Sequence, residues 1–220
     1  MSHRNRKGSK AFYDWMKINS VANKRDLQLI NYALLEIRKS PFIFEEKKPS
    51  IRFKPMDFSR DSGKIGCDYN GIKKSLYEIN NFIKIDQNNF IKSCRYNDLD
   101  RICEFEFNLN AYDLLRLGNS CLFNSNQFKH SFHLRTEVAL RLYNYVGKWR
   151  YSKKTKFIFI RDLKNLLGVD KAAYTRFERF RSCIIDQSLE EINVYTGNKV
   201  DYELRKTGNK VESIRFIHTK

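Results

Sequence analysis

The apolar residues of this 220-residue chain repeat one order of secondary structure twice, with helices first and a two-stranded ribbon after them. In the first copy, apolar side chains recur at helical spacing over residues 27–37 and 69–82, which predicts two helices. Apolar and polar residues alternate over 51–54, 90–94 and 102–109, which predicts strands. The last two of these strands form the ribbon of the first copy.

The second copy has the same order and clearer signals. Helices are expected over residues 135–151 and 161–167, with a short strand at 156–160 between them. A further helix is expected over 172–193, either continuous or kinked, and a hairpin over 198–216 with its tip at a glycine. Helices followed by a β-ribbon are the order of a winged helix, in which a helix-turn-helix precedes a β-wing. The sequence therefore predicts an α+β protein of two tandem winged-helix domains.

Composition gives the expected domain boundaries. Residues 118–134 include a stretch rich in Asn, Ser and Gln, which predicts a linker between a domain at 19–117 and a domain at 135–220. Residues 1–18 are expected to form a basic flexible arm. Because that arm lacks the apolar core of a secretory signal, the cytoplasm is the expected location.

Charge indicates the kind of partner. The chain has 42 Lys and Arg against 25 Asp and Glu, a formal net charge of +17, which is typical of proteins that bind a polyanion. The excess lies at the two ends, because residues 61–134 carry 9 basic and 9 acidic side chains. Basic and acidic residues are interleaved, and no apolar run is long enough to span a membrane, so we expect no membrane partner.

The second helix of a helix-turn-helix reads DNA, so it needs an apolar inner face and hydrogen-bond donors outside. In residues 171–183 one stripe at helical spacing is apolar: Ala173, Phe177, Phe180 and Ile184. The expected DNA contacts are the polar and basic side chains opposite and beside that stripe, with others from the preceding helix and the hairpin: Lys164, Lys171, Tyr174, Thr175, Arg176, Arg179, Arg181, Arg205, Lys206 and Lys210. A merely solvated basic face is the alternative, but the preceding short helix, the Gly168 turn and the ribbon complete the motif.

The equivalent helix of the first copy carries Lys73 and Lys74 near its start. These two lysines are further expected DNA contacts. The sequence supports them less strongly than the contacts of the second copy, because the middle third of the chain, residues 61–134, has no net charge. The first domain is therefore expected to make auxiliary DNA contacts or to serve as a dimerisation surface.

Several C-terminal segments resemble the second winged-helix domain of the iteron-binding plasmid replication initiators, the Rep proteins. They are Leu140-Arg141-Leu142-Tyr143, Asp162-Leu163-Lys164-Asn165-Leu166-Leu167-Gly168, the pattern Tyr174-x-x-Phe177-x-x-Phe180-Arg181-x-x-Ile184-Ile185, Leu189-Glu190-Glu191-Ile192-Asn193 and Val200-Asp201-Tyr202-Glu203. Residues 27–34 are similar to the first helix of that family. Where the family commonly has a Pro-Ala pair, this chain has Gln187-Ser188, so a softer kink is expected.

The resemblance implies a bacterial cytoplasmic protein that binds repeated double-stranded sites, the iterons, at a plasmid origin. It further implies melting or marking of the adjacent duplex and recruitment of host replication proteins. A monomer–dimer equilibrium, with the dimer repressing its own gene, is also implied. A winged-helix transcriptional regulator without a replication role is the alternative, and only the family pattern favours replication. An RNA-binding module would favour aromatic side chains exposed on a sheet, whereas the Phe and Tyr residues mostly occupy positions expected in the core.

No enzymatic activity, cofactor or metal is expected. His130, His133 and Cys121 could approach one another, but two further ligands at suitable spacing are lacking. Glu104 and Glu106 alternate on one strand face, which is more often a solvated face than an acid and base pair. The sequence has no Gly-rich phosphate loop, and its five cysteines include no C-x-x-C pair.

Overall fold

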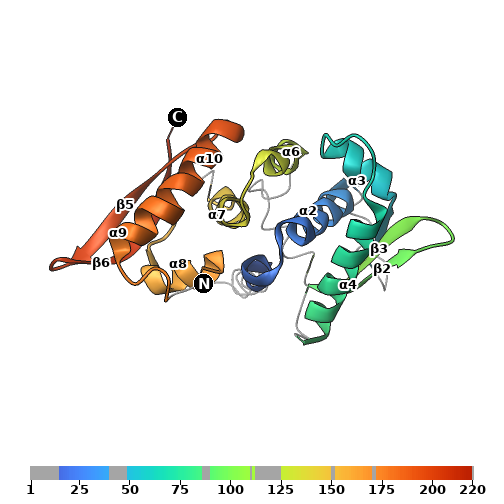
Figure 1. The fold of residues 1–220 in the computed structure, drawn as a ribbon, viewed down its shortest axis with the longest axis horizontal. Helices are drawn as coiled ribbons and strands as arrows, with labels where there is room; N and C mark the ends of the chain where they lie inside the picture. The colour runs from blue at the N-terminus through green and yellow to red at the C-terminus, as the bar shows by residue number, and fades with distance from the viewer. Residues whose placement is uncertain are drawn as a thin grey trace. The chain divides into compact units, whose positions relative to one another are not determined.

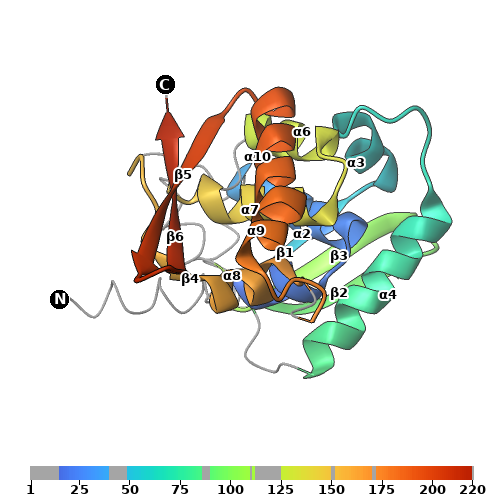
Figure 2. The same ribbon diagram turned by 60° about the vertical axis from the view of Figure 1, so that its left-hand side comes forward.

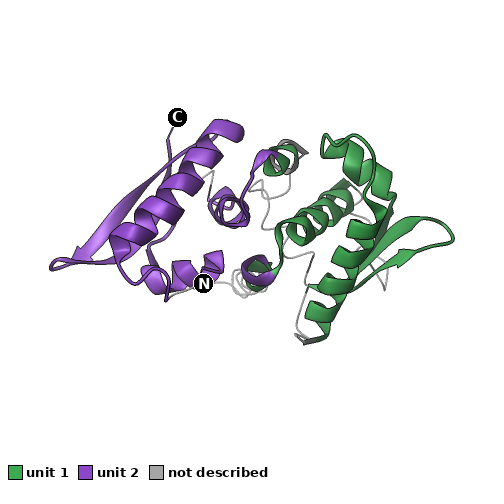
Figure 3. Cartoon of the chain, in the orientation of Figure 1, with its two compact units in different colours: residues 1–18, 22–119, 123–132 green, residues 19–21, 120–122, 133–220 purple. Residues whose placement is uncertain are grey.

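A computed structural model describes residues 15–39, 49–85, 90–109, 111, 125–149, 152–169 and 172–219. The chain divides into two compact units (Figure 3). Unit 1 comprises residues 1–18, 22–119 and 123–132, and unit 2 comprises residues 19–21, 120–122 and 133–220. None of the described helices combines the length and the apolar character that a membrane crossing requires.

Unit 1 packs helices against a three-stranded antiparallel sheet with the strand order β1-β3-β2 (Figure 1). Its elements are α2 (Lys24–Lys39), β1 (Ser50–Phe53), α3 (Pro55–Asp61), α4 (Tyr69–Ile85), β2 (Ile91–Asn97), β3 (Ile102–Phe107) and α6 (Ser125–His133). Residues 15–21 are also helical. The helices and strands predicted for the first copy are all present.

The core of unit 1 follows from the spacing of its apolar residues. Asn23 begins α2, because its side-chain oxygen accepts a hydrogen bond from the backbone N–H of Asp26 at 3.0 Å. On the sheet, alternate residues of β3 face inward, and Phe105 and Phe107 are fully buried. The outward-facing Glu104 is paired with Arg52 at 3.0 Å and also with Arg95, as expected for a solvated sheet face.

Two elements of unit 1 differ from the prediction. No helix was expected between the strand at 51–54 and the helix at 69–82, but in the structure Pro55 is the first residue of α3. Proline fits there because the first N–H of a helix needs no partner. Residues 125–133 lie in the segment predicted as a linker, and they form α6. A short aromatic contact stabilises this helix, since the Phe132 ring lies edge-on against Phe58 with 5.6 Å between the ring centres.

The two buried thiols of unit 1 predict a loss of stability in alkali. Burial raises the pKa of Cys94 and of Cys103 to about 12, and the Cys94 thiol donates a hydrogen bond to the carbonyl of Leu76 at 3.2 Å. Because the unfolded chain releases these protons first, the free energy of unfolding should fall by about 1.5 kcal/mol between pH 8 and pH 9.5. Urea unfolding across this range, compared with the Cys94→Ala/Cys103→Ala variant, measures the effect. Parallel pH profiles for the two proteins would contradict it.

Unit 2 repeats the order of elements of unit 1, as Figures 1 and 2 show. Its elements are α7 (Glu137–Gly147), β4 (Ile158–Phe159), α8 (Ile160–Leu167), α9 (Phe177–Phe180), η3 (Arg181–Asp186), α10 (Gln187–Tyr195), β5 (Lys199–Thr207) and β6 (Lys210–Thr219). The antiparallel sheet has the strand order β4-β6-β5. Thr136 begins α7 by accepting a hydrogen bond from the N–H of Ala139 at 3.1 Å.

The helix predicted over 172–193 starts later than expected and has an irregular middle. Residues 172–176 are not helical, and α9, η3 and α10 then continue without a break from Phe177 to Tyr195. The segment η3 is a π-helical turn, in which hydrogen bonds join residues five apart. The buried face therefore passes from Phe180 to Ile185 rather than to Ile184. The π turn stands just before the position where a softened kink was expected.

Candidate DNA interface

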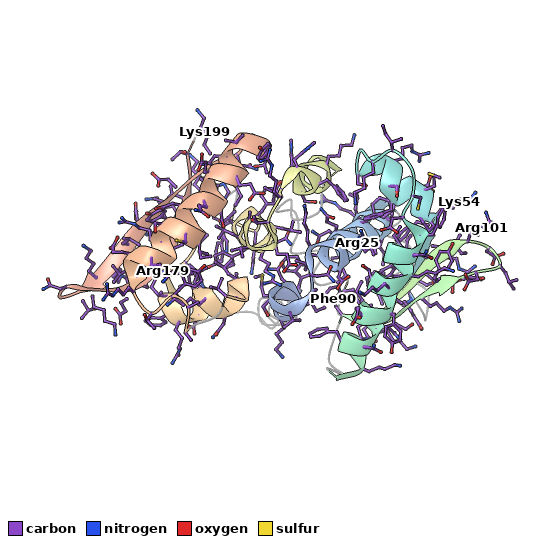
Figure 4. All side chains as sticks on the ribbon, viewed as in Figure 1. Arg25, Lys54, Phe90, Arg101, Arg179 and Lys199 are labelled. Carbon is purple, nitrogen blue, oxygen red and sulfur yellow. The ribbon has the colours of Figure 1, made fainter. Side chains whose placement is uncertain are left out.

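The outward face of α9 and η3 carries the central residues of the predicted interface. Arg179, labelled in Figure 4, is exposed there. Ser182 is also exposed, while Phe180 is fully buried and fixes the helix on the unit. Thr175 and Arg176 are also exposed, but they lie in the turn before the helix. Within the described part of the chain, no carboxylate lies within ion-pair distance of Arg176 or Arg179. Their donors are therefore available to an anionic ligand.

Arg181 differs from Arg179 because carboxylates of the same helix neutralise it. Its guanidinium lies 2.8 Å from Glu178 and 3.8 Å from Asp186. Asp186 also accepts a hydrogen bond from the hydroxyl of Tyr202 in β5 at 3.0 Å, and burial together with this bond raises the pKa of Tyr202 to about 12. Asp186 thus links the helix to the sheet, and binding DNA through Arg181 would require loss of the ion pairs with Glu178 and Asp186.

The structure places Lys164 inside unit 2, not on the predicted DNA face. Its side chain is largely buried, and the amino group donates a hydrogen bond to the backbone carbonyl of Tyr174. The same amino group lies 5.1 Å from the centre of the Phe180 ring. Lys164 therefore holds residues 172–176 in their non-helical turn and positions α9. Tyr174 is half-buried, with its ring 6.3 Å from that of Phe180. Lys171 lies outside the described residues.

The wing of unit 2 is the β5–β6 hairpin. Gly208 has φ = 60° at the turn, a conformation that glycine adopts without strain. Lys206 and Lys210 are exposed beside this turn. A β-bulge lies between Arg205 and Lys206, and Arg205 stacks on the ring of Phe157 with 4.0 Å from its guanidinium carbon to the ring centre. Lys206 and Lys210 thus remain at the tip, whereas Arg205 belongs to a face of the sheet.

We expect the wing lysines to contact phosphates. Lys206→Ala should weaken binding to every duplex by a similar factor and should lower the slope of log affinity against log salt by about 1, because one phosphate contact is lost. Lys199→Ala is the matched control, since Lys199 is an exposed lysine at the other end of β5 (Figure 4). Fluorescence anisotropy over a salt series measures both variants. A sequence-dependent loss in Lys206→Ala would instead assign this lysine to base recognition.

In unit 1 the two predicted lysines lie on α4 but differ in their surroundings. Lys73 is paired with Asp98 and lies 4.7 Å from the centre of the Tyr96 ring. Lys74 is exposed. The exposed Tyr77 lies on the same side, three residues after Lys74, and was not predicted. The exposure of Tyr77 could have been predicted from the helical spacing of the apolar residues in α4, because position 77 falls outside the buried stripe.

The histidines weighed as metal ligands lie at the end of α6. His133 is exposed and His130 is half-buried, while Cys121 lies outside the described residues. Among the residues that the structure describes, no three His, Cys, Asp or Glu side chains are grouped closely enough to hold a metal ion.

The element order, the two sheets and the hairpin wings define a protein built from two winged-helix units, as predicted. Residues 160–217 match the family model described as "Initiator Rep protein, WH2". This segment is therefore similar to the second winged-helix domain of the initiator Rep proteins, and the predicted resemblance is confirmed for the motifs within residues 160–217.

A solved structure extends the likeness to nearly the whole chain. The "Crystal structure of Pi initiator protein in complex with iteron DNA" matches with a TM-score of 0.62 and 16% sequence identity, over 92% of this chain and 93% of that chain. At this identity the match shows a common fold. A search of the proteins with curated descriptions gave no match.

Proposed function

We propose that this protein initiates the replication of a plasmid by binding directly repeated double-stranded sites, the iterons, at the plasmid origin. The observation that carries the proposal is the match of residues 160–217 to the initiator Rep domain, because the part of the candidate DNA interface in unit 2 lies within these residues. The fold shared with the Pi initiator, which was solved on iteron DNA, supports the same function.

The two units are proposed to make different contacts with the DNA. In unit 2, Arg179 with Thr175 and Arg176 reads base edges in the major groove, while Lys206 and Lys210 lie on the flanking backbone. Unit 1 makes auxiliary contacts through Lys74 and the exposed face of α4. The protein supplies binding energy and orientation rather than chemistry, so we propose no enzymatic step.

The proposed setting is the bacterial cytoplasm. The proposed partners are the origin repeats, a second copy of this chain and host replication proteins. We propose that the monomer binds the repeats and that a dimer represses the gene of the protein itself.

Selection of bound duplexes from a random DNA pool, followed by a footprint in the replicon that encodes the protein, tests this function. We expect one motif that occurs as directly repeated copies in a non-coding region. A single palindrome at a promoter would instead identify a transcriptional regulator without a replication role. Failure to enrich any duplex would overturn both functions.

A further inference from the structure

The α9 helix directs an acidic residue as well as a basic one away from the core of unit 2. Phe177 is half-buried and Phe180 is fully buried, so the two residues between them, Glu178 and Arg179, point outward together. The side chain of Glu178 is 69% exposed. Glu178 is not among the expected DNA contacts, although it lies on the same face as Arg179.

The side chains of Glu178 and Arg179 have neighbours in opposite directions along the chain. The guanidinium carbon of Arg179 lies 6.0 Å from the centre of the Tyr174 ring, in the turn before the helix. The carboxylate of Glu178 lies 2.8 Å from the guanidinium of Arg181, one turn later. The outward face of α9 therefore presents a cation toward its start and a carboxylate toward its end. The two groups can reach different base pairs of one duplex.

Glu178 is able to bind a further hydrogen-bond donor. A carboxylate accepts several hydrogen bonds at once, and an exposed ion pair such as that with Arg181 is worth at most about 1 kcal/mol. Arg181 also lies 3.8 Å from Asp186, which accepts a hydrogen bond from the hydroxyl of Tyr202 at 3.0 Å. Arg181 therefore keeps a carboxylate partner when Glu178 turns to a ligand.

A carboxylate in the major groove discriminates among the bases because it only accepts hydrogen bonds. The exposed edge of guanine presents acceptors, thymine presents an acceptor and a methyl group, and adenine presents an acceptor beside its amino group. Cytosine presents an amino donor and no acceptor of its own. The phosphates also repel a carboxylate. Glu178 therefore disfavours every sequence except one that places a cytosine amino group within its reach.

We infer that Glu178 reads a cytosine of the recognised duplex, by accepting a hydrogen bond from its N4 amino group in the major groove. The inference rests on the proposed function, since it requires that α9 lies in the major groove of that duplex. It adds an acidic specificity-determining residue to the basic ones. Glu178 acts mainly by excluding other sequences, because with another base beside it an acceptor faces an acceptor.

Competition binding with the full chain and a panel of single-base variants of the selected duplex tests the inference. Glu178→Ala should reduce the preference for cytosine at one position about tenfold. The same variant should bind an unrelated duplex at least as tightly as the wild type, because a charge that repels phosphates is removed. Glu178→Gln should shift the preference at that position from cytosine toward adenine, since an amide matches the neighbouring acceptor and donor of adenine.

Glu190→Ala is the matched control. Glu190 is an exposed acidic residue on α10 of the same unit, so its removal changes the net charge equally. This variant should keep every base preference of the wild type. Circular dichroism verifies that each variant is folded.

The outcomes separate this inference from the proposed function. Equal base preferences of Glu178→Ala and Glu190→Ala would overturn the inference, because Glu178 would then act through its charge alone. A lost preference for a base other than cytosine would overturn it as well. A selected motif that is a single palindrome would exclude the replication role, but the panel would still show whether Glu178 reads a cytosine in that palindrome.

Discussion

Replacement of Gly168 by alanine is expected to lower the free energy of unfolding of unit 2 by about 4 kcal/mol. Gly168 ends α8 in the left-handed conformation, with φ = 64°. This conformation is about 1–2 kcal/mol less favourable for a residue with a Cβ atom than the right-handed helical conformation. The added Cβ would also lie 2.5 Å from the backbone carbonyl oxygen of Ser20 and would overlap the guanidinium of Arg141. These contacts account for the remaining loss.

The overlap is costly because Arg141 cannot move away. Its side chain is 7% exposed, and its Nη1 donates a hydrogen bond to the carbonyl of Leu167 at 2.8 Å. Its Nη2 lies 3.2 Å from Glu137 one turn earlier on α7. A shift of this guanidinium would leave a helix-terminal carbonyl without its partner and a buried charge without its carboxylate.

Gly197→Ala is the matched control for this prediction. Gly197 has the same φ of 64°, but no atom lies within 4 Å of the position that its Cβ would take. Its substitution should therefore cost only the conformational term, about 1–2 kcal/mol. Hydrogen exchange of the amides in α8 and β6 measures the opening free energy of unit 2 in each variant. Equal losses for the two variants would show that the contact with Arg141 and Ser20 adds nothing.

Elements with local signals could be predicted from the sequence. The helices α2 and α4 have apolar residues at regular helical spacing, and β3 alternates cleanly, so each element was found with nearly correct ends. Gly168 and Gly208 likewise stand where the chain takes a left-handed turn. In these places the residue type and its neighbours along the chain determine the conformation.

Features that depend on distant residues could not be predicted. Lys164 looked like a DNA contact, because its partner is a backbone carbonyl ten residues away in a turn that periodicity does not reveal. The π turn of η3 moved the buried face to Ile185, since it changes the number of residues per turn. Arg141 was recognised only as part of a family motif, and only the fold shows that its guanidinium donates a hydrogen bond to the carbonyl of Leu167 at the end of α8.

The α9–η3 segment is proposed to read the bases of the DNA through Arg179. Arg179→Ala is expected to weaken binding to the selected duplex by about 1–3 kcal/mol, or roughly fivefold to 150-fold, and to relax the preference at one base position. Arg179 is exposed, and its guanidinium carbon lies 6.0 Å from the centre of the Tyr174 ring, which orients it without neutralising it. Competition binding against a panel of single-base variants of the duplex measures both the affinity and the preference.

Arg181→Ala separates base reading from general attraction to the phosphates. Both arginines lie in the same helix, so removal of either one lowers the net charge equally. Because Glu178 and Asp186 already pair with Arg181, its loss should cost the specific duplex less than the loss of Arg179, and the base preference should remain. If Arg181→Ala abolishes the preference while Arg179→Ala leaves it intact, the ion pairs of Arg181 break on binding and the reading residue is Arg181. If neither substitution changes the affinity or the preference, the α9–η3 segment does not read the DNA.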